Sequence, residues 1–204
     1  MDTALRVAIL VIVSYFLGAI PFSYIAGKLI RGIDLREYGS GNLGAANTFR
    51  VLGKGAAIPV LLADIGKGFL AVKLVQAYGL EGYQYVIIAA LIVIIGHNYS
   101  IFVRFAGGKG VGTTAGTFLA MAPCAVLICL GIWIILLMIS RIVSVASMIA
   151  ASCLPIAIAL MNRFTSCNSH VSVLYLSMVA ALFVIYKHRS NIRRLREGTE
   201  KRIF

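Results

Sequence analysis

The residues best suited to chemistry lie in two glycine-rich segments, and the first of these is Gly39–Arg50. Glycine combined with Ser and Asn can fold so that backbone N–H groups converge on an anion, and an arginine can add a bidentate charged clamp. A plain flexible loop is the alternative, because Gly and Asn also mark ordinary turns. The candidate residues here are Gly39, Ser40, Gly41, Asn42, Asn47 and Arg50.

The second segment is Gly107–Thr114, where glycines surround Lys109 ahead of an apolar run. This pattern predicts a helix N-terminus suited to phosphate. It is not the Walker A loop of nucleotide hydrolases, because Val103 stands where that motif needs glycine and Gly110 stands where it needs Ser or Thr. A phosphate-binding nest is therefore favoured over a nucleotide hydrolase. Its candidate residues are Gly107, Gly108, Lys109 and Gly110.

Further polar residues sit in or beside apolar runs. His188 and Asn191 are three residues apart in the basic tail, so they share one face of a helix. The tail's other cations suit attraction to anionic lipid. For Asp64 and Lys67, inside an apolar run, we favour a structural ion pair over a functional site. For His97 we favour a structural role. Ser144 begins an apolar run, and composition alone gives it no special role.

The composition indicates what kind of element must position these residues. The chain has 204 residues, of which 60% are hydrophobic and 13% charged, and its mean hydropathy is +0.94. Soluble domains carry about 25% charged residues, and disorder needs low hydrophobicity, so an integral membrane protein remains. The net charge of +12 is then explained by cytoplasmic loops, and no nucleic-acid partner is implied. No Cys/His cluster suggests a metal site or a disulfide framework.

The apolar runs predict an all-α fold with about seven transmembrane helices, one of them short. The stretch Val111–Ser140 decides the number, since one tilted helix gives six spans, whereas a break near Pro123 gives seven with a short Val111–Met121. The predicted spans are Leu5–Ile30, Ala56–Tyr78, Tyr83–Val103, Val111–Met121, a span from Pro123 to Ser140, Ile142–Met161 and His170–Tyr186.

Charge counting favours the seven-span arrangement. It places 15 of the 19 Lys and Arg on one face, whereas six spans would divide them almost evenly. The positive-inside rule then puts the N-terminus outside and the C-terminus in the cytoplasm. We expect a single domain over residues 1–204, with cytoplasmic loops at 31–55 and 104–110 and a basic tail at 187–204.

Together these motifs resemble the bacterial acyl-phosphate:glycerol-3-phosphate acyltransferase family, the PlsY type. The resemblance covers nearly the whole chain, from Ser14–Tyr24 through both glycine-rich segments to the tail from His188. Two positions depart from the family pattern: Ala46 replaces a common Thr, and Ala106 a frequent basic residue. The order and spacing of the motifs make the resemblance specific.

The resemblance implies a multi-pass enzyme of the bacterial inner membrane that works on its cytoplasmic side. It would transfer an acyl group from acyl phosphate to the sn-1 hydroxyl of glycerol 3-phosphate, giving lysophosphatidic acid and inorganic phosphate. No cofactor, metal or required protein partner is implied. The glycines around Lys109 would belong to the glycerol 3-phosphate site. The implied catalytic and phosphate-binding set is Ser40, Arg50, Lys109, Ser144, His188 and Asn191.

The chemistry fits these residue types, because both substrates carry phosphate and acyl phosphate is already activated. No covalent enzyme intermediate is needed, and cations with backbone donors would hold the reactants and stabilise the departing phosphate. A substrate phosphate or His188 would take the proton, and we favour a phosphate-binding or orienting role for His188. The His-x-x-x-x-Asp motif of other glycerolipid acyltransferases is absent.

Two further hypotheses come from other classes. A transporter or channel for an anionic metabolite would use the same cations, but it needs polar groups on both sides of the membrane midplane. The polar motifs of this chain are predicted to lie on one face. A structural subunit that only binds anionic lipid would leave the segment Gly39–Arg50 unexplained.

Overall fold

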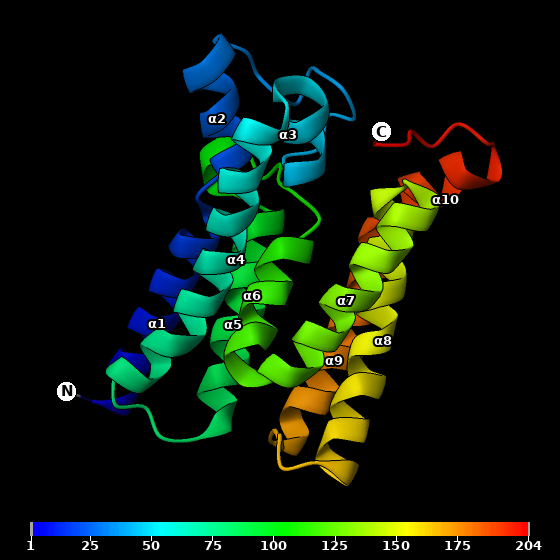
Figure 1. Cartoon of the computed structure of the whole chain (residues 1–204). Coiled ribbons are helices and arrows are strands. Elements are labelled where there is room, and N and C mark those ends of the chain that lie inside the picture. Colours follow the sequence, from blue (N-terminus) through cyan, green and yellow to red (C-terminus); the bar gives the residue numbers. More distant parts are fainter. Residues whose placement is uncertain (1, 204) are drawn as a thin grey trace. The chain divides into compact units, whose positions relative to one another are not determined.

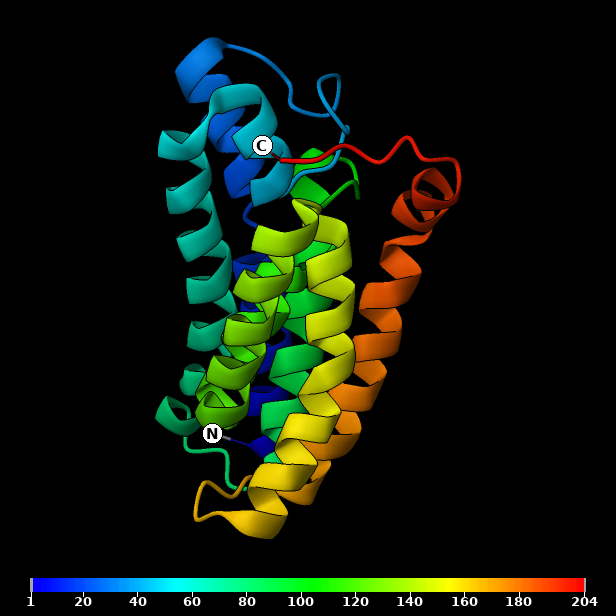
Figure 2. The same cartoon turned by 45° about the vertical axis from the view of Figure 1, so that its right-hand side comes forward.

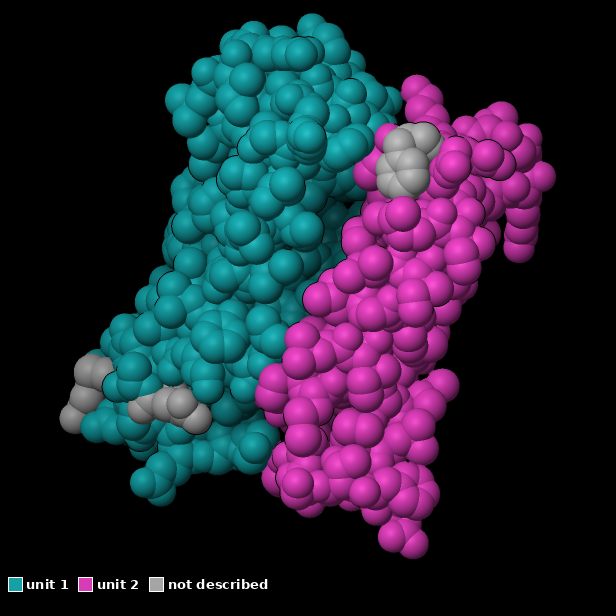
Figure 3. Space-filling view, in the orientation of Figure 1, with its two compact units in different colours: residues 1–120 teal, residues 121–204 magenta. Residues whose placement is uncertain are grey.

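The computed structural model describes residues 2–203, apart from the side chain of Gln76. Throughout that range the regular elements are helices, as the composition predicts. The chain divides into two compact units, residues 1–120 and 121–204, coloured separately in Figure 3. Whether both belong to one functional domain stays a prediction.

Unit 1 is built on long helices that lie side by side, with two shorter helices at one end (Figures 1 and 2). Helix α1 ends at Ala19 and α2 begins at Phe22, because Pro21 between them lacks the N–H that a continuous helix would need. The helices are α1 (Thr3–Ala19), α2 (Phe22–Arg31), α3 (Ala45–Leu52), α4 (Lys54–Ala77), α5 (Tyr83–Asn98), the 3₁₀ turn η1 (Ile101–Val103) and α6 (Val111–Met121), whose last residue reaches unit 2.

Small residues let the helices of unit 1 approach closely. A Cβ added at Gly18 of α1 would overlap the carbonyl oxygen of Val93 in α5. A Cβ at Gly116 of α6 would likewise overlap the carbonyl oxygen of Ile65 in α4. Such contacts replace the hydrophobic driving force that is missing inside a bilayer. The close packing fixes α6, and with it the glycine-rich segment that precedes it, against α4.

Unit 2 contains α7 (Pro123–Ser140), α8 (Val143–Phe164), α9 (Val171–Lys187) and α10 (Arg189–Arg196). Helices α7 and α8 pack on each other, and the Trp133 Nε1–H donates to the Ser147 hydroxyl at 3.1 Å. The chain bends by 54° between α9 and α10. The predicted break near Pro123 is confirmed, since Ala122 leaves the helical conformation and Pro123 opens α7.

Four described stretches are long and apolar enough to cross a membrane: Thr3–Arg31, Tyr83–Val103, Pro123–Ser140 and Val143–Phe164. The bent pair of α9 and α10 would make a fifth. The integral membrane class is therefore supported, whereas seven spans and the direction of the termini stay predictions.

Candidate functional site

The first glycine-rich segment is held in shape by Asn47, which is 1% exposed. Its Oδ1 accepts a hydrogen bond from the Ser40 backbone N–H at 2.7 Å. Its Nδ2 donates to the carbonyls of Leu35 and Tyr38 at 3.1 and 3.0 Å. Both amide hydrogens are thus used inside the loop. Asn47, predicted as a phosphate-binding residue, organises the segment that presents Ser40.

Backbone conformation explains two glycines of the segment, and the contact with Asn47 adds a second reason for Gly39. Gly39 and Gly41 have φ of +66° and +70°, a conformation that other residues rarely adopt. A Cβ at Gly39 would overlap the Asn47 Oδ1 atom. Ser40, between them, is exposed, and Asn42 is half-buried. Arg50 lies in the last turn of α3 and is half-buried.

Arg36 ties the start of this segment to the second polar loop. Its Nη1 donates to the Val103 carbonyl at 3.0 Å, and its guanidinium pairs with Asp34. The hydrogen bond from Arg36 holds the pKa of Asp34 below its usual value. Leu35, Leu43 and Val103 form a buried apolar cluster beneath the two loops. The loops are thereby part of one packed structure rather than free connections.

The two glycine-rich segments meet at Gly108. A Cβ at this position would lie 2.6 Å from the carbonyl oxygen of Leu43 in the first segment. The Gly108 N–H donates to the His97 carbonyl at 3.2 Å, and Gly110 has a φ of +80°. Helix α6 begins at Val111, so Lys109 lies just before a helix N-terminus, as predicted. Within unit 1 the structure therefore brings the Ser40 and Lys109 segments together.

The glycines around Lys109 are required by space. A Cβ at Gly107 would lie 2.6 Å from the Asn98 carbonyl oxygen, and one at Gly110 would lie 2.7 Å from the Asn98 Nδ2 atom. Only glycine lets the backbone approach α5 this closely. Lys109 itself is half-buried. The arrangement suits a loop whose backbone and one ammonium group face a small anion.

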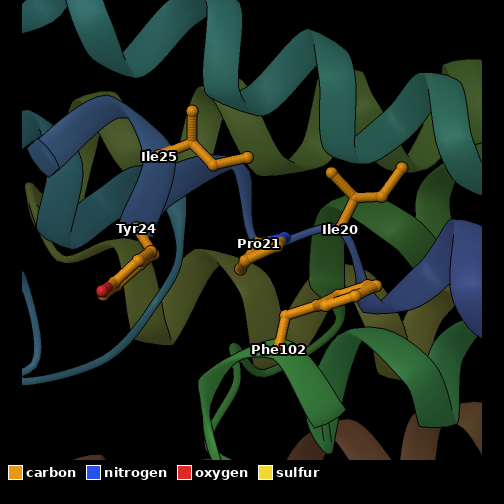
Figure 4. Close-up of a pocket in the computed structure, with 5 residues that line it drawn as sticks. All are labelled: Ile20, Pro21, Tyr24, Ile25 and Phe102. Atoms are coloured by element: carbon orange, nitrogen blue, oxygen red, sulfur yellow. The ribbon is translucent and has the colours of Figure 1, made fainter. Parts of the chain in front are cut away.

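An apolar pocket of about 360 Å³ lies at the break between α1 and α2, where no sequence motif predicts one. Figure 4 shows its lining, which combines aliphatic and aromatic side chains with Pro21. Such a lining suits hydrocarbon rather than phosphate. The only sequence signal was the interruption of the first apolar run. The lining residues are Ile20, Pro21, Tyr24, Ile25 and Phe102.

In unit 2, two of the predicted residues meet at the carboxylate of Glu200, which no sequence motif indicates. The Ser144 hydroxyl and the Asn191 amide donate to Glu200 Oε1 at 2.7 and 2.6 Å. Arg194 donates to Glu200 Oε2 at 2.7 Å, and the Glu200 side chain is 3% exposed. Burial opposes ionisation of Glu200, but the hydrogen bonds from Asn191, Ser144 and Arg194 outweigh it and lower the pKa of its carboxyl.

His188 lies at the joint between α9 and α10 and is 3% exposed. Its Nδ1 is 2.7 Å from the carbonyl oxygen of Val184, which can only accept, so Nδ1 carries a proton. Nε2 is then the nitrogen that gains or loses the second proton. Asn191 lies one turn further on the same face, as the spacing predicts.

The predicted ion pair between Asp64 and Lys67 is confirmed inside unit 1. Lys67 Nζ is 2.9 Å from Asp64 Oδ1, and both side chains are buried. His97 Nδ1 approaches the same oxygen at 3.4 Å. Over residues 2–203, no group of three or more His, Cys, Asp or Glu side chains is placed to hold a metal ion.

Apolar helices of spanning length, joined by glycine-rich polar loops, define an integral membrane protein. Residues 8–198 match the family of glycerol-3-phosphate acyltransferases. A relative from Synechococcus sp. (strain CC9902), named glycerol-3-phosphate acyltransferase, is 44% identical over 96% of this chain and 94% of its own. One from Moorella thermoacetica, named glycerol-3-phosphate acyltransferase 2, is 45% identical over 94% of this chain and 95% of its own.

Two solved structures are also similar, both of PlsY (YgiH), an integral membrane glycerol 3-phosphate acyltransferase. The glycerol 3-phosphate form gives a TM-score of 0.84 and the lysophosphatidic acid form 0.82. Each is 35% identical and covers 96% of this chain and 94% of its own. The chain belongs to the glycerol-3-phosphate acyltransferase family. It is a membrane-embedded acyltransferase, which confirms the resemblance found in the sequence.

Proposed function

We propose that the chain transfers a fatty acyl group from acyl phosphate to the sn-1 hydroxyl of glycerol 3-phosphate. The products are lysophosphatidic acid and inorganic phosphate, and the reaction takes place at the bacterial inner membrane. The observation that carries this proposal is the meeting of the Ser40 and Lys109 segments at Gly108. It builds one glycine-rich polar surface in unit 1, suited to phosphate. The similar structures, in glycerol 3-phosphate and lysophosphatidic acid forms, support the same substrate and product.

The proposed reaction forms one ester bond and breaks one anhydride bond. The sn-1 oxygen of glycerol 3-phosphate attacks the acyl carbonyl carbon, and the bond from that carbon to the phosphate oxygen breaks. The electron pair of the broken bond leaves on the phosphate oxygen, which gives inorganic phosphate. The hydroxyl proton goes to a substrate phosphate. Cations and backbone donors stabilise the charge on the departing phosphate. We assign this role in unit 1 to Lys109 and Arg50, with Ser40 as a hydroxyl donor.

In unit 2 we assign phosphate contacts to His188 and Asn191, with Ser144 beside them. The Nδ1 hydrogen bond to Val184 fixes the ring of His188, and we assign its Nε2 atom to a phosphate oxygen. This contact requires the imidazolium, because a neutral ring with its proton on Nδ1 has no donor at Nε2. The residue lies at the 54° bend between α9 and α10.

The test is an assay of purified protein with acyl phosphate and glycerol 3-phosphate that follows lysophosphatidic acid and phosphate release. Acyl-CoA serves as the alternative donor. Lys109→Ala and Arg50→Ala are expected to lose product. Lys73→Ala and Arg163→Ala are the matched controls, since both side chains are exposed and lie outside the polar loops. We expect the controls to retain activity.

Three outcomes would contradict the proposal. Product from acyl-CoA but not from acyl phosphate would show that the proposed donor is wrong. Equal losses in the loop variants and the control variants would remove the cationic loops from the site. No product with either donor, from folded protein, would favour transport of an anionic metabolite, and flux into liposomes would then be the next measurement.

A further inference from the structure

A cluster of three ionisable side chains lies buried between α4 and α5 and is not used in the proposed reaction. Asp64 Oδ1 lies 2.9 Å from Lys67 Nζ, with which it forms an ion pair, and 3.4 Å from His97 Nδ1. Lys67 also donates to the carbonyl of Ile20 at 3.0 Å and lies over the ring of Phe22. The side chains of Asp64, Lys67 and His97 are 6%, 2% and 8% exposed.

The far edge of the His97 ring contacts the second glycine-rich segment. A Cβ at Gly108 would overlap His97 Nε2, so the ring lies directly against the Gly108 backbone. The backbone of His97 also accepts the Gly108 N–H at 3.2 Å. One residue of α5 thus supports the loop twice, once by its carbonyl and once by its ring. Lys109 follows immediately in the chain.

Ion pairing alone explains only part of this arrangement. Asp64 and Lys67 neutralise each other, yet apolar residues of similar volume would often serve stability as well as a buried ion pair does. The ion pair leaves unexplained why an imidazole stands between the carboxylate and the loop. An ionised Asp64 orients the His97 ring by facing Nδ1, which directs Nε2 toward Gly108.

We propose that Asp64, held by Lys67, orients His97 so that its ring positions the Gly107–Lys109 backbone for the glycerol 3-phosphate anion. His97 is then a positioning residue that acts through the loop and does not touch substrate. The inference rests on the proposed function of that loop. It assigns a role in substrate affinity to a charge cluster that lies within the helices.

The test compares two conservative variants of His97. His97→Asn keeps an amide nitrogen near the position of Nδ1 but removes the ring edge at Gly108. His97→Gln keeps an amide near the position of Nε2 and so retains contact with the loop. A third variant, Asp64→Leu with Lys67→Met, removes both charges together and leaves no unpaired buried ion. Ser14→Ala is the control, because Ser14 is a buried polar residue of unit 1 outside the cluster.

The direct measurement is amide hydrogen exchange of a peptide covering residues 104–112, in detergent. We expect exchange about tenfold faster in His97→Asn and in the double variant, because the oriented ring edge at Gly108 is lost, and less change in His97→Gln, which keeps a side chain there. The KM for glycerol 3-phosphate should rise about tenfold in the same variants, with a smaller change in the KM for acyl phosphate. Ser14→Ala should match wild type.

Unchanged exchange at 104–112 in His97→Asn would overturn the positioning role, even if activity fell. Faster exchange spread evenly over unit 1 would also overturn it, since the cluster would then act as general stabilisation. Equal rises in both KM values would show that the loop does not select glycerol 3-phosphate. Wild-type protein that makes no lysophosphatidic acid would refute the proposed function, while the exchange comparison would still report on the loop.

Discussion

Asn191 donates a hydrogen bond of 2.6 Å to Glu200, a residue of the chain's last segment. The same carboxylate oxygen accepts from Ser144, which lies 56 residues earlier at the start of α8. A single acidic side chain therefore holds the tail, α10 and α8 together in unit 2. Two residues proposed to serve the reaction depend on it for their orientation.

Replacing Glu200 by Gln is the first test of that relationship. The amide keeps one acceptor oxygen but places an NH₂ group against a donor and removes the ion pair with Arg194. We expect a loss of unfolding free energy of about 1–3 kcal/mol, as for a buried donor left without its acceptor. Glu197→Gln is the matched control, because that carboxylate is exposed and 3.9 Å from Arg193. Thermal unfolding in detergent measures both, and equal melting temperatures would contradict the structure.

The lowered pKa of Glu200 predicts how this contribution depends on pH. The pKa of this carboxyl is lower in the folded chain than its ordinary value of 4.5. Its stabilisation is therefore complete above that value and is lost as pH falls through the lower folded pKa. The melting temperature of Glu200→Gln should lie below wild type near about pH 7, and the difference should shrink as pH falls below 4.5. A difference that is constant over this range would refute the assignment.

Because Nδ1 of His188 donates to Val184, the proton on Nε2 distinguishes two roles for this residue. A phosphate contact through Nε2 needs the imidazolium, so activity would fall as rising pH removes that proton. A general base needs the neutral ring, so activity would rise over the same range. We expect the falling profile, in the pH dependence of kcat/KM for wild type. His188→Gln should flatten this limb, and a rising limb that the variant abolishes would assign the base to His188.

Gly108 is predicted to tolerate no side chain. In Gly108→Ala the new Cβ would overlap His97 Nε2 and lie 2.6 Å from the Leu43 carbonyl oxygen, so the two glycine-rich segments must separate. We expect activity to fall at least about a hundredfold, in line with the cost of small misplacement at an active site. Gly66→Ala is the control, because no atom lies within 4 Å of its added Cβ. Retained activity in Gly108→Ala would show that the segments need not touch.

Local features of this fold could be predicted from the sequence because their causes are local. Pro123 ends one helix and begins another, and the glycines before Val111 precede a helix start, as their conformational preferences require. The inward orientation of Asn47 could not be predicted. The composition of the segment Gly39–Arg50 indicates an anion site, but the Asn47 amide instead bonds three backbone groups of the surrounding loop.

Contacts between distant residues account for what the sequence did not indicate. Glu200 and Ser144 are far apart in the chain, and no spacing rule links a tail carboxylate to the start of a helix. His97 was expected to be structural, and only the packing of α5 against α4 places it between Asp64 and Gly108. The pair of Asp64 and Lys67 could be predicted, because residues at i and i+3 are neighbours on a helix surface.

The Ile203 N–H donates to the Arg141 carbonyl, so the last described residues are attached to unit 2 beyond Glu200 as well. Terminal residues are often trimmed to help crystallisation, because most carry little structure. Deleting the residues after Arg196 would here remove the acceptor for Ser144, Asn191 and Arg194 at once. Loss of activity in such a shortened protein would therefore report damage to unit 2 rather than the loss of a dispensable tail.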